Sequence, residues 1–248
     1  MARRRGARLT PADWTADEMM TVAAARHLAD GEVCFVGIGL PSTVANLARR
    51  THAPHLVLVY ESGTIGTKPR TIPLSIGDGE LAETADAVVS VPEIFNYWLQ
   101  PGRIDVGFLG AAELDRWGDI NTTVIGDYDA PVVRLPGAGG APEIAASCGR
   151  VLVVMRHGRR AFVERVGFRT SLGERVSTVI TDIGVLERDA ERAELVLTAL
   201  HPGATLDQAR ADTGWDLAVA DEVATTAAPS PEELAVLREL EATKGQAA

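Results

Sequence analysis

The segment Glu61-Ser62-Gly63-Thr64-Ile65-Gly66 places a carboxylate directly after the short apolar run Leu56 to Tyr60. The run predicts a strand, and open α/β sheets bind their ligands beyond the carboxyl ends of the strands. A carboxylate at this position is a candidate for a functional role. Ser62 does not form a nucleophile elbow, because that motif needs glycine where Tyr60 and Thr64 stand. Taken alone, the segment favours a structural glutamate that bonds the backbone of its own turn.

A glycine turn, Gly37-Ile38-Gly39-Leu40-Pro41, lies between another predicted strand and a helix. Such a turn offers unpaired backbone N–H groups to an anion. It resembles part of a dinucleotide-binding fingerprint, with Glu61 about 20 residues further on as the ribose-binding acid. Ser42 stands where the third glycine is required. An NAD-binding oxidoreductase domain is therefore a rival interpretation, and a plain tight turn is favoured over it.

A second glycine-rich loop, residues 136–142, precedes a predicted helix over residues 143–148. Its N–H groups could face an oxyanion, or its glycines could simply permit positive φ. The basic run Arg156 to Arg160 could meet phosphates but is more typical of a solvated turn. His201, a lone histidine at a strand end, receives no catalytic role.

Composition excludes several classes of function. The 34 acidic and 24 basic residues give a formal charge of −10, which disfavours non-specific binding to nucleic acid or to an anionic membrane. Cys34 and Cys148 lack metal-ligand spacing and are predicted to be buried thiols, so we expect no metal site. No apolar run is long enough to span a membrane, and no secretory apolar stretch follows the basic N-terminus. We therefore expect a cytoplasmic protein.

Short apolar runs alternate with amphipathic segments along the chain. Thr15 and Glu18 predict a capping box at the first helix, and Ser230 and Glu233 predict another at the last. Strands are predicted over residues 32–36, 56–60, 87–91, 104–109, 121–125, 132–135, 151–155, 163–170, 178–186 and 195–200, and helices over 13–30, 42–50, 93–99, 143–148, 206–212 and 230–240.

Continuously apolar runs such as Val57-Leu58-Val59 indicate strands that are covered on both faces. The predicted fold is α/β, with an open, largely parallel sheet, helices on both faces and mixed strands in the second half. We expect a single domain over residues 15–241, flanked by disordered tails at 1–14 and 242–248.

Five segments, taken in order, resemble one known family. They are G-I-G-L-P (37–41), Y-E-S-G (60–63), G-A-A-E-L-D-R-W-G-D-I-N (110–121), I-G-D-Y (125–128) and G-A-G-G-A (137–141). The chain is similar to the β subunit of glutaconate CoA-transferase and its class I relatives, including the 3-oxoacid and 3-oxoadipate CoA-transferases. The resemblance runs from about Thr15 to Pro231. Asp119 departs from the asparagine usual in relatives, and we expect this departure to affect a turn rather than the chemistry.

The resemblance implies that Glu61 is the nucleophile of a ping-pong reaction that passes through a glutamyl-CoA thioester. It implies a homologous α subunit as partner in a heterotetramer or larger assembly, without which the chain is inactive. Coenzyme A enters as a thioester substrate, no cofactor is bound permanently, and the acid is dicarboxylic or a 3-oxo acid. The residues assigned to the oxyanion or coenzyme A are Gly37, Gly39, Gly137, Gly139, Gly140 and Ala141, and those assigned to substrate are Ser62, Gly63, Arg70 and Arg134.

The sequence leaves several alternatives open. Access of water would make the protein an acyl-CoA hydrolase. Some relatives are ring-cleaving hydrolases that lack the nucleophilic glutamate, and the presence of Glu61 counts against that activity. A non-catalytic effector-binding domain is a further possibility, although no DNA-binding helix pair accompanies it.

Overall fold

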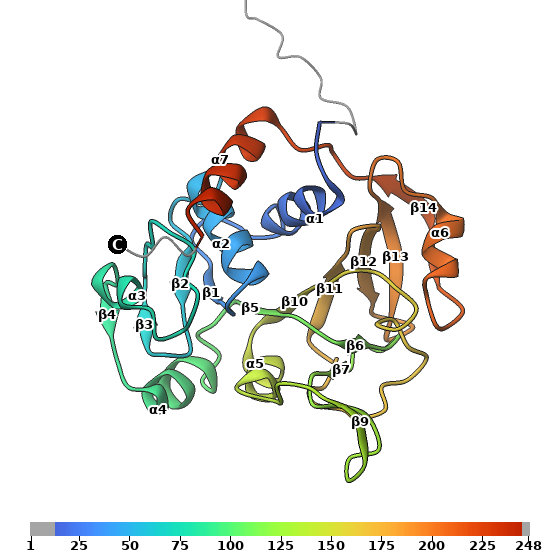
Figure 1. Cartoon of the computed structure of the whole chain (residues 1–248), viewed down its shortest axis with the longest axis horizontal. Coiled ribbons are helices and arrows are strands. Elements are labelled where there is room, and N and C mark those ends of the chain that lie inside the picture. Colours follow the sequence, from blue (N-terminus) through green and yellow to red (C-terminus); the bar gives the residue numbers. More distant parts are fainter. Residues whose placement is uncertain (1–12, 245–248) are drawn as a thin grey trace, which may run out of the picture.

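A ten-stranded sheet forms the centre of the computed structural model, which describes residues 13–244 (Figure 1). The strand order is β14-β13-β12-β11-β10-β5-β1-β2-β3-β4. In chain order these strands are β1 Val33–Phe35, β2 Val57–Val59, β3 Thr64–Ile65, β4 Ala87–Val88, β5 Val106–Leu109, β10 Arg150–Val154, β11 Val176–Ile180, β12 Gly184–Asp189, β13 Glu194–Leu200 and β14 Val219–Thr225.

Two small antiparallel pairs and eight helical segments complete the described chain. The pairs are β6 Glu113–Leu114 with β7 Ile120–Asn121, and β8 Val124–Gly126 with β9 Pro131–Arg134. The helices are α1 Ala16–Ala25, α2 Leu40–Arg50, α3 Gly79–Glu83, α4 Val91–Glu93, the π-helix η1 Ile94–Leu99, α5 Ala141–Ser147, α6 Leu206–Ala211 and α7 Pro231–Ala242.

The middle of the sheet is parallel. Strands β2, β1, β5, β10 and β11 all run in the same direction, whereas β3 and β4 on one side and β12 and β13 on the other introduce antiparallel pairing. The predicted fold class, a largely parallel sheet with mixed strands in the second half, is confirmed. Because these five strands are parallel, their carboxyl ends meet at one edge, where the segments that follow β1, β2 and β5 can form a shared site.

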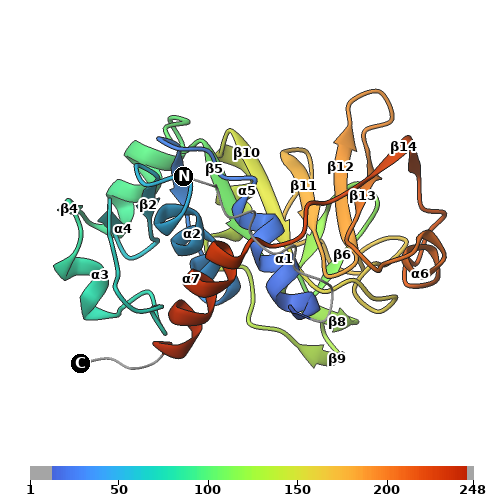
Figure 2. The ribbon, with the colours of Figure 1, turned by 90° about the horizontal axis from the view of Figure 1, so that it is seen from above.

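Helices cover both faces of this sheet. Helices α1, α2 and α7 pack over one face around an apolar cluster that includes Leu47, Leu58 and Leu237. The other face is covered by η1 and α5, whose side chains join a second cluster with Phe35 and Val153. Figure 2 shows the strands extending from β4 at one end of the molecule to β14 at the other. The central strands are thus buried on both sides, as their continuous apolar runs indicate.

Both predicted capping boxes are present. Thr15 Oγ1 accepts from Glu18 N, and Ser230 Oγ accepts from Glu233 N, with each glutamate bonded back to the backbone N–H of its cap residue. Helix α1 ends earlier than predicted, at Ala25 instead of residue 30; Arg26 is its C-cap, and the side chain of Arg26 binds Glu233 at 2.7 Å. The predicted start of the second helix at Ser42 was also wrong, because Gly39 is the N-cap of α2.

The second half of the chain differs most from the prediction. Residues 163–170 do not form a strand. The backbone there lies against the buried Asp115, whose Oδ2 accepts a hydrogen bond from Val166 N. The single strand predicted over 178–186 is two antiparallel strands, β11 and β12, since Thr181 closes a turn between them. The strand predicted over 121–125 is divided between β7 and β8. Elements that the sequence did not predict include β3, α3, β6 and β14.

Residues 1–12 and 245–248, which contain most of the two predicted tails, lie outside the described part of the chain. Helix α7 extends one residue beyond the predicted domain boundary at 241. Within residues 13–244 there is no helix that is long and apolar enough to cross a membrane. Nor does any group of three or more His, Cys, Asp or Glu side chains in that range have the geometry of a metal site.

Candidate active site

Glu61 lies in a tight turn between the parallel strand β2 and the short strand β3. Gly63 N donates to Tyr60 O, and Tyr60 N donates to Thr64 O, each at 3.0 Å. Residues 61–63 thus form a three-residue hairpin loop whose last position requires positive φ. Gly63 has φ of +104°, and a Cβ placed on it would lie 1.9 Å from Val89 O. The glycine of the E-S-G segment is therefore required by the backbone, and the turn places Glu61 at the edge of the sheet.

The carboxylate of Glu61 is not engaged by the rest of the described chain. The side chain is half-buried, yet within residues 13–244 it accepts no hydrogen bond and forms no ion pair. The interpretation of Glu61 as a glutamate that bonds its own turn is therefore wrong. A carboxylate that no structural contact requires remains available for chemistry.

The glycine loop at 136–140 meets Glu61 through Gly140. A Cβ placed on Gly140 would lie 3.3 Å from Glu61 Cδ, and 2.8 and 3.2 Å from Cζ and Cε1 of Phe95. The absence of a side chain at Gly140 thus lets the carboxyl group and the aromatic ring approach the same backbone. Phe95, in the π-helix η1, was not singled out from the sequence. Its neighbouring residues resemble an ordinary amphipathic helix, and π-turns are frequent at functional sites.

The other glycine turn lies at the same edge of the sheet. Phe35 pairs with Val59 in the parallel register of β1 and β2, and Val36 N donates to Val59 O beyond it. Gly37 and Glu61 each stand two residues past that last pair. Gly39 has φ of +84° and forms the N-cap of α2 without a side-chain cap. The Gly37 turn therefore lies at the carboxyl end of β1, as its position after a predicted strand indicates, and the loop at 136–140 reaches the same edge through Gly140.

Some backbone N–H groups of the loop at 136–141 donate hydrogen bonds within the described chain, and others do not. The N–H of Gly137 donates to Thr122 O, and that of Ala141 donates to Ala138 O. Among residues 13–244, no backbone carbonyl accepts from Gly139 or Gly140. Of the predicted oxyanion donors in this loop, Gly139 and Gly140 are therefore the two with N–H groups available for a ligand.

A hydrogen bond between two buried hydroxyl groups anchors the turn that carries Glu61. The Tyr60 hydroxyl is 2.7 Å from Ser42 Oγ on α2, so the residue before Glu61 is tied to the helix that follows the Gly37 turn. Burial raises the pKa of Tyr60 to about 12, which keeps its hydroxyl protonated. Ser62 Oγ is buried without a hydrogen-bond partner in the described chain, directly beside Glu61. Buried hydroxyls are usually hydrogen-bonded, so this one is a candidate for a functional role.

The two arginines proposed for substrate are engaged elsewhere. Arg70 Nε is 2.9 Å from Glu80 Oε1. Burial of Glu80 opposes ionisation, but hydrogen bonds from Thr71 and Arg70 outweigh it and lower the pKa of Glu80 to about 2. Arg134 lies over the ring of Tyr128 at 4.9 Å, on the β8–β9 hairpin that projects from the body in Figure 1. The contacts that hold these two side chains do not include Glu61.

The remaining candidates have structural surroundings. His157 is buried and stacks on Phe162 with ring centroids 3.9 Å apart, which corrects its assignment to a solvated turn. His201 is bonded between Thr181 O and Thr226 Oγ1. Asp119 pairs with Arg169 and accepts from Gly173 N, so its carboxylate is used to hold a turn. Cys34 and Cys148 are free and buried, as predicted.

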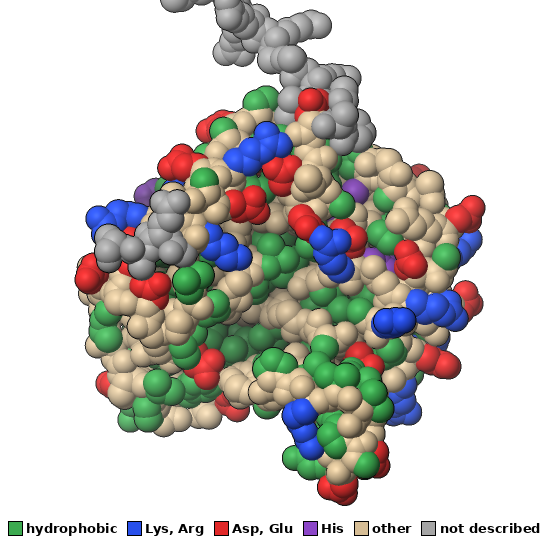
Figure 3. Space-filling model, viewed as in Figure 1, with side chains coloured by type: hydrophobic (Ala, Val, Ile, Leu, Met, Phe, Trp, Pro, Cys, Tyr) green, Lys and Arg blue, Asp and Glu red, His purple; other side chains and the backbone are tan. Residues whose placement is uncertain are grey.

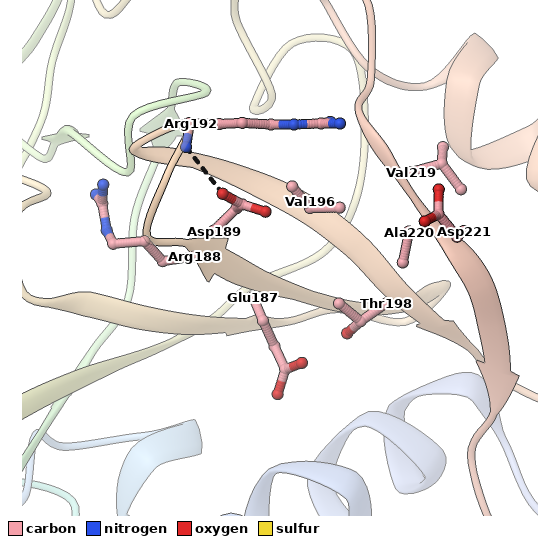
Figure 4. A pocket seen from close by; sticks show the side chains of 9 residues that line it. All are labelled: Glu187, Arg188, Asp189, Arg192, Val196, Thr198, Val219, Ala220 and Asp221. Atoms are coloured by element: carbon pink, nitrogen blue, oxygen red, sulfur yellow. Dashed lines mark hydrogen bonds between the residues drawn. The ribbon is translucent and has the colours of Figure 1, made fainter.

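Glu61 is not among the residues that line the cavity drawn in Figure 4. This cavity has a volume of about 320 Å³ and lies among β12, β13 and β14, where Arg192, Thr198 and Asp221 form part of its wall (Figure 4). Strands β11, β10, β5 and β1 separate β12 from β2 in the sheet. The chemistry of Glu61, together with the glycine turns around it, favours the β2 edge as the active site. Figure 3 shows that the face of the molecule seen in Figure 1 is hollowed near its middle, with apolar side chains in the hollow.

An open α/β sheet that presents an unengaged carboxylate beside glycine loops contains the groups that transfer through a carboxylate nucleophile requires. The sequence profile of the coenzyme A transferase family matches residues 17–211. The chain is 56% identical over 244 residues to the B-type subunit of 3-oxoadipate CoA-transferase from Pseudomonas knackmussii, covering 92% of this chain and 94% of that protein. The chain belongs to the coenzyme A transferase family.

Two further comparisons agree with this assignment. The chain is 32% identical over 257 residues to the B-type subunit of glutaconate CoA-transferase from Acidaminococcus fermentans, covering 95% of each protein. The crystal structure of glutaconate coenzyme A-transferase from the same organism superposes with a TM-score of 0.85 at 29% identity, over 92% of this chain and 94% of that one. The predicted family and the predicted enzyme class, a CoA-transferase subunit, are confirmed, which decides against the NAD-binding alternative.

Proposed function

We propose that this chain is the B-type subunit of a transferase that moves coenzyme A between an acyl-CoA and a carboxylic acid, with Glu61 as the covalent nucleophile. The single observation that carries the proposal is the position of the Glu61 carboxylate. It is free of hydrogen bonds and ion pairs within the described chain and lies against Gly140 at the carboxyl ends of the parallel strands.

The reaction proceeds in two symmetrical halves. A Glu61 oxygen attacks the thioester carbonyl, the C–S bond breaks, and coenzyme A leaves as a thiolate, which gives an acyl-glutamyl anhydride. The thiolate then attacks Cδ of Glu61, and the donor acid leaves as a carboxylate. The acceptor acid reverses both steps, so that Glu61 returns to its free carboxylate. Holding the two reactants against one side chain replaces an encounter in solution with an oriented attack.

The loop around Gly140 supplies stabilisation for this chemistry. Each attack places negative charge on a carbonyl oxygen, and preorganised backbone N–H groups stabilise such an oxyanion by roughly 3 kcal/mol per donor in other enzymes. Gly140 lies beside Glu61, and the N–H groups of Gly139 and Gly140 have no backbone acceptor within the described chain, so both are candidates for this role. Those of Gly37 and Gly39 are candidates for the same oxyanion or for coenzyme A. The thioester is a substrate, so no permanently bound cofactor is needed.

We infer that the acid is a dicarboxylic or a 3-oxo acid, with 3-oxoadipate as the first substrate to test. This inference rests on the relative of 56% identity, which is named for 3-oxoadipate. Ser62 Oγ, buried and without a partner, is the side chain beside Glu61 that could donate to the substrate. Arg70 and Arg134 would have to leave their present contacts with Glu80 and Tyr128 to bind a distal carboxylate.

We further infer that an A-type subunit completes the active site. The relatives that the chain matches are named as B-type subunits, which implies a partner chain. Gly140 and Phe95 border Glu61 on one side, and the side chain remains partly exposed in the single chain. A second chain would supply the missing wall, and we expect this chain alone to be inactive.

Borohydride trapping tests the covalent step. The purified complex of this chain with its A-type partner is incubated with acyl-CoA and then with borohydride, which reduces the glutamyl thioester and releases coenzyme A. We expect loss of transfer activity and a mass change confined to the peptide that contains Glu61. Retained activity together with an unmodified peptide would exclude the nucleophile role. Product analysis with and without an acceptor acid separates a transferase from a hydrolase.

A further inference from the structure

Phe95 occupies an unusual position in the chain. It is the second residue of the π-helix η1, in which Gln100 N donates to Phe95 O and Arg103 N donates to Trp98 O, each spanning five residues. The wider turn lets Ile94 and Leu99, five residues apart, both face the core. Phe95 lies next to Ile94 and is only half-buried, so its ring lies at the boundary between the core and the open edge of the sheet.

Two contacts hold the Phe95 ring in place. Phe35, the last residue of β1, packs edge-on against it with centroids 6.2 Å apart and an interplanar angle of 62°. The far edge of the ring, at Cζ and Cε1, faces Gly140, where the position of a Cβ would be 2.8 Å from Cζ. Glu61 Cδ approaches that same point to 3.3 Å. The Phe95 ring, Gly140 and the Glu61 carboxyl group therefore meet at one point, which we call the corner. The C–H edge of the ring forms the wall of this corner that has no hydrogen-bonding group.

This corner matters because Glu61 Cδ is the atom that becomes activated. In the thioester intermediate it is the carbonyl carbon, and the acceptor carboxylate must reach it before water does. If water attacks, its oxygen bonds to Cδ, the C–S bond breaks and coenzyme A leaves as a thiolate. One proton of the water goes to the thiolate and the other to solvent, and Glu61 is restored as a carboxylate. The thioester is then lost without activating the acceptor. Controlling water at Cδ therefore decides between transfer and hydrolysis.

We propose that Phe95 is the residue of this chain that keeps water away from the activated Glu61 carbonyl and so sets the ratio of transfer to hydrolysis. The proposal rests on the proposed function, in which Glu61 carries the thioester. The ring removes one direction of approach to Cδ and offers no hydrogen bond that would hold a water there. Because Phe35 fixes the ring independently of any partner, this wall belongs to the B-type chain itself.

The test measures hydrolysis and transfer together in the purified two-subunit complex. Coenzyme A release without acceptor and acyl transfer to 3-oxoadipate are compared for the wild type, Phe95→Ala and Tyr97→Ala. Tyr97 lies two residues further along the same π-helix and is 62% exposed, so it is the matched control. We expect Phe95→Ala to raise the hydrolysis-to-transfer ratio about tenfold, which corresponds to about 1.4 kcal/mol. Tyr97→Ala should leave the ratio unchanged.

A conservative series separates water exclusion from a general loss of structure. Phe95→Leu retains most of the apolar volume and should keep the ratio near that of the wild type, whereas Phe95→Val should be intermediate. This series also serves if Phe95→Ala fails to fold. An unchanged ratio across the series, with the Glu61 peptide still trapped by borohydride, would overturn the role of Phe95. Failure to trap Glu61 in the wild-type complex would instead overturn the proposed function.

Discussion

Gly140 and Glu61 meet across the edge of the sheet so closely that a single methyl group on Gly140 would stand 3.3 Å from the carboxyl carbon of Glu61. The two residues belong to different loops, one after β2 and one before α5. Their contact joins the predicted nucleophile to the loop that carries the available N–H groups. The rate of transfer should therefore depend on how closely the two loops pack.

Gly140→Ala should reduce the rate of transfer at least tenfold while the protein remains folded. The added Cβ would lie 2.8 Å from Phe95 Cζ, closer than real Cβ contacts, so either the ring or the loop must move away from Glu61. A displacement of about 1 Å in a reacting group can cost about a hundredfold in rate. Steady-state kinetics of the two-subunit complex measures the effect.

Gly167→Ala provides the matched control for that substitution. Gly167 is exposed, and a Cβ placed on it would meet nothing within 4 Å. Its transfer rate should equal that of the wild type. Equal rates for both alanine variants would contradict the importance of close packing at Gly140.

Glu61→Gln should abolish transfer without destabilising the fold. The carboxylate makes no hydrogen bond or ion pair within residues 13–244, so replacing it with an amide removes no native contact. The free energy of unfolding should change by less than about 0.5 kcal/mol. Urea denaturation measures the free energy of unfolding, and the transfer assay measures the rate of transfer.

Glu80→Gln should lower the free energy of unfolding, whereas Glu61→Gln should not. Glu80 accepts hydrogen bonds from Thr71 Oγ1 at 2.6 Å and from Arg70 Nε at 2.9 Å, with its side chain 15% exposed. Losing the charged acceptor should cost about 1–3 kcal/mol of stability, because the donors keep only weaker partners. A stability loss of similar size in Glu61→Gln would show that Glu61 has a structural role after all.

Tyr60→Phe and Ser42→Ala should show strong energetic coupling. Each substitution alone leaves one member of the buried 2.7 Å pair without this partner, at a cost of about 1–3 kcal/mol. The double variant removes both hydroxyls and should cost less than the sum of the single variants. A double-mutant cycle from urea denaturation measures the coupling, and strict additivity would mean that the pair does not form.

Stability should fall between about pH 6.5 and pH 4, in part because of His157. Burial lowers the pKa of His157 to about 4, below the value of about 6.5 expected in the unfolded chain. The unfolded chain therefore binds a proton in this window that the folded protein does not. The stability that neutral His157 contributes, at most about 3 kcal/mol, is fully present above pH 6.5 and is lost as the pH falls toward 4.

The variant His157→Gln should flatten this pH dependence when urea denaturation is repeated between pH 7 and pH 4.5. The slope should not vanish, because burial also lowers the pKa of His27 and His201. An identical slope in the wild type and the variant would show that His157 is protonated equally in both states.

The sequence by itself determined the local elements that surround the site. Side chains at fixed spacing specify the capping boxes of Thr15 and Ser230, and continuous apolar runs specify the parallel strands around β1, β2 and β5. These signals are readable because they depend on neighbours in the chain. For the same reason the E-S-G segment could be placed in a turn after a strand, although its residues alone favoured a structural glutamate.

Only the tertiary structure decided which of the candidate groups meet. Gly140 reaches Glu61 although β5 and β1 lie between β10 and β2 in the sheet, and Phe95 joins them from a π-helix whose sequence resembles an ordinary helix. Arg134 instead covers Tyr128 on a projecting hairpin. Contacts between distant loops depend on how the strands are ordered and packed, and a periodicity read along one segment contains no information about its neighbours across the sheet.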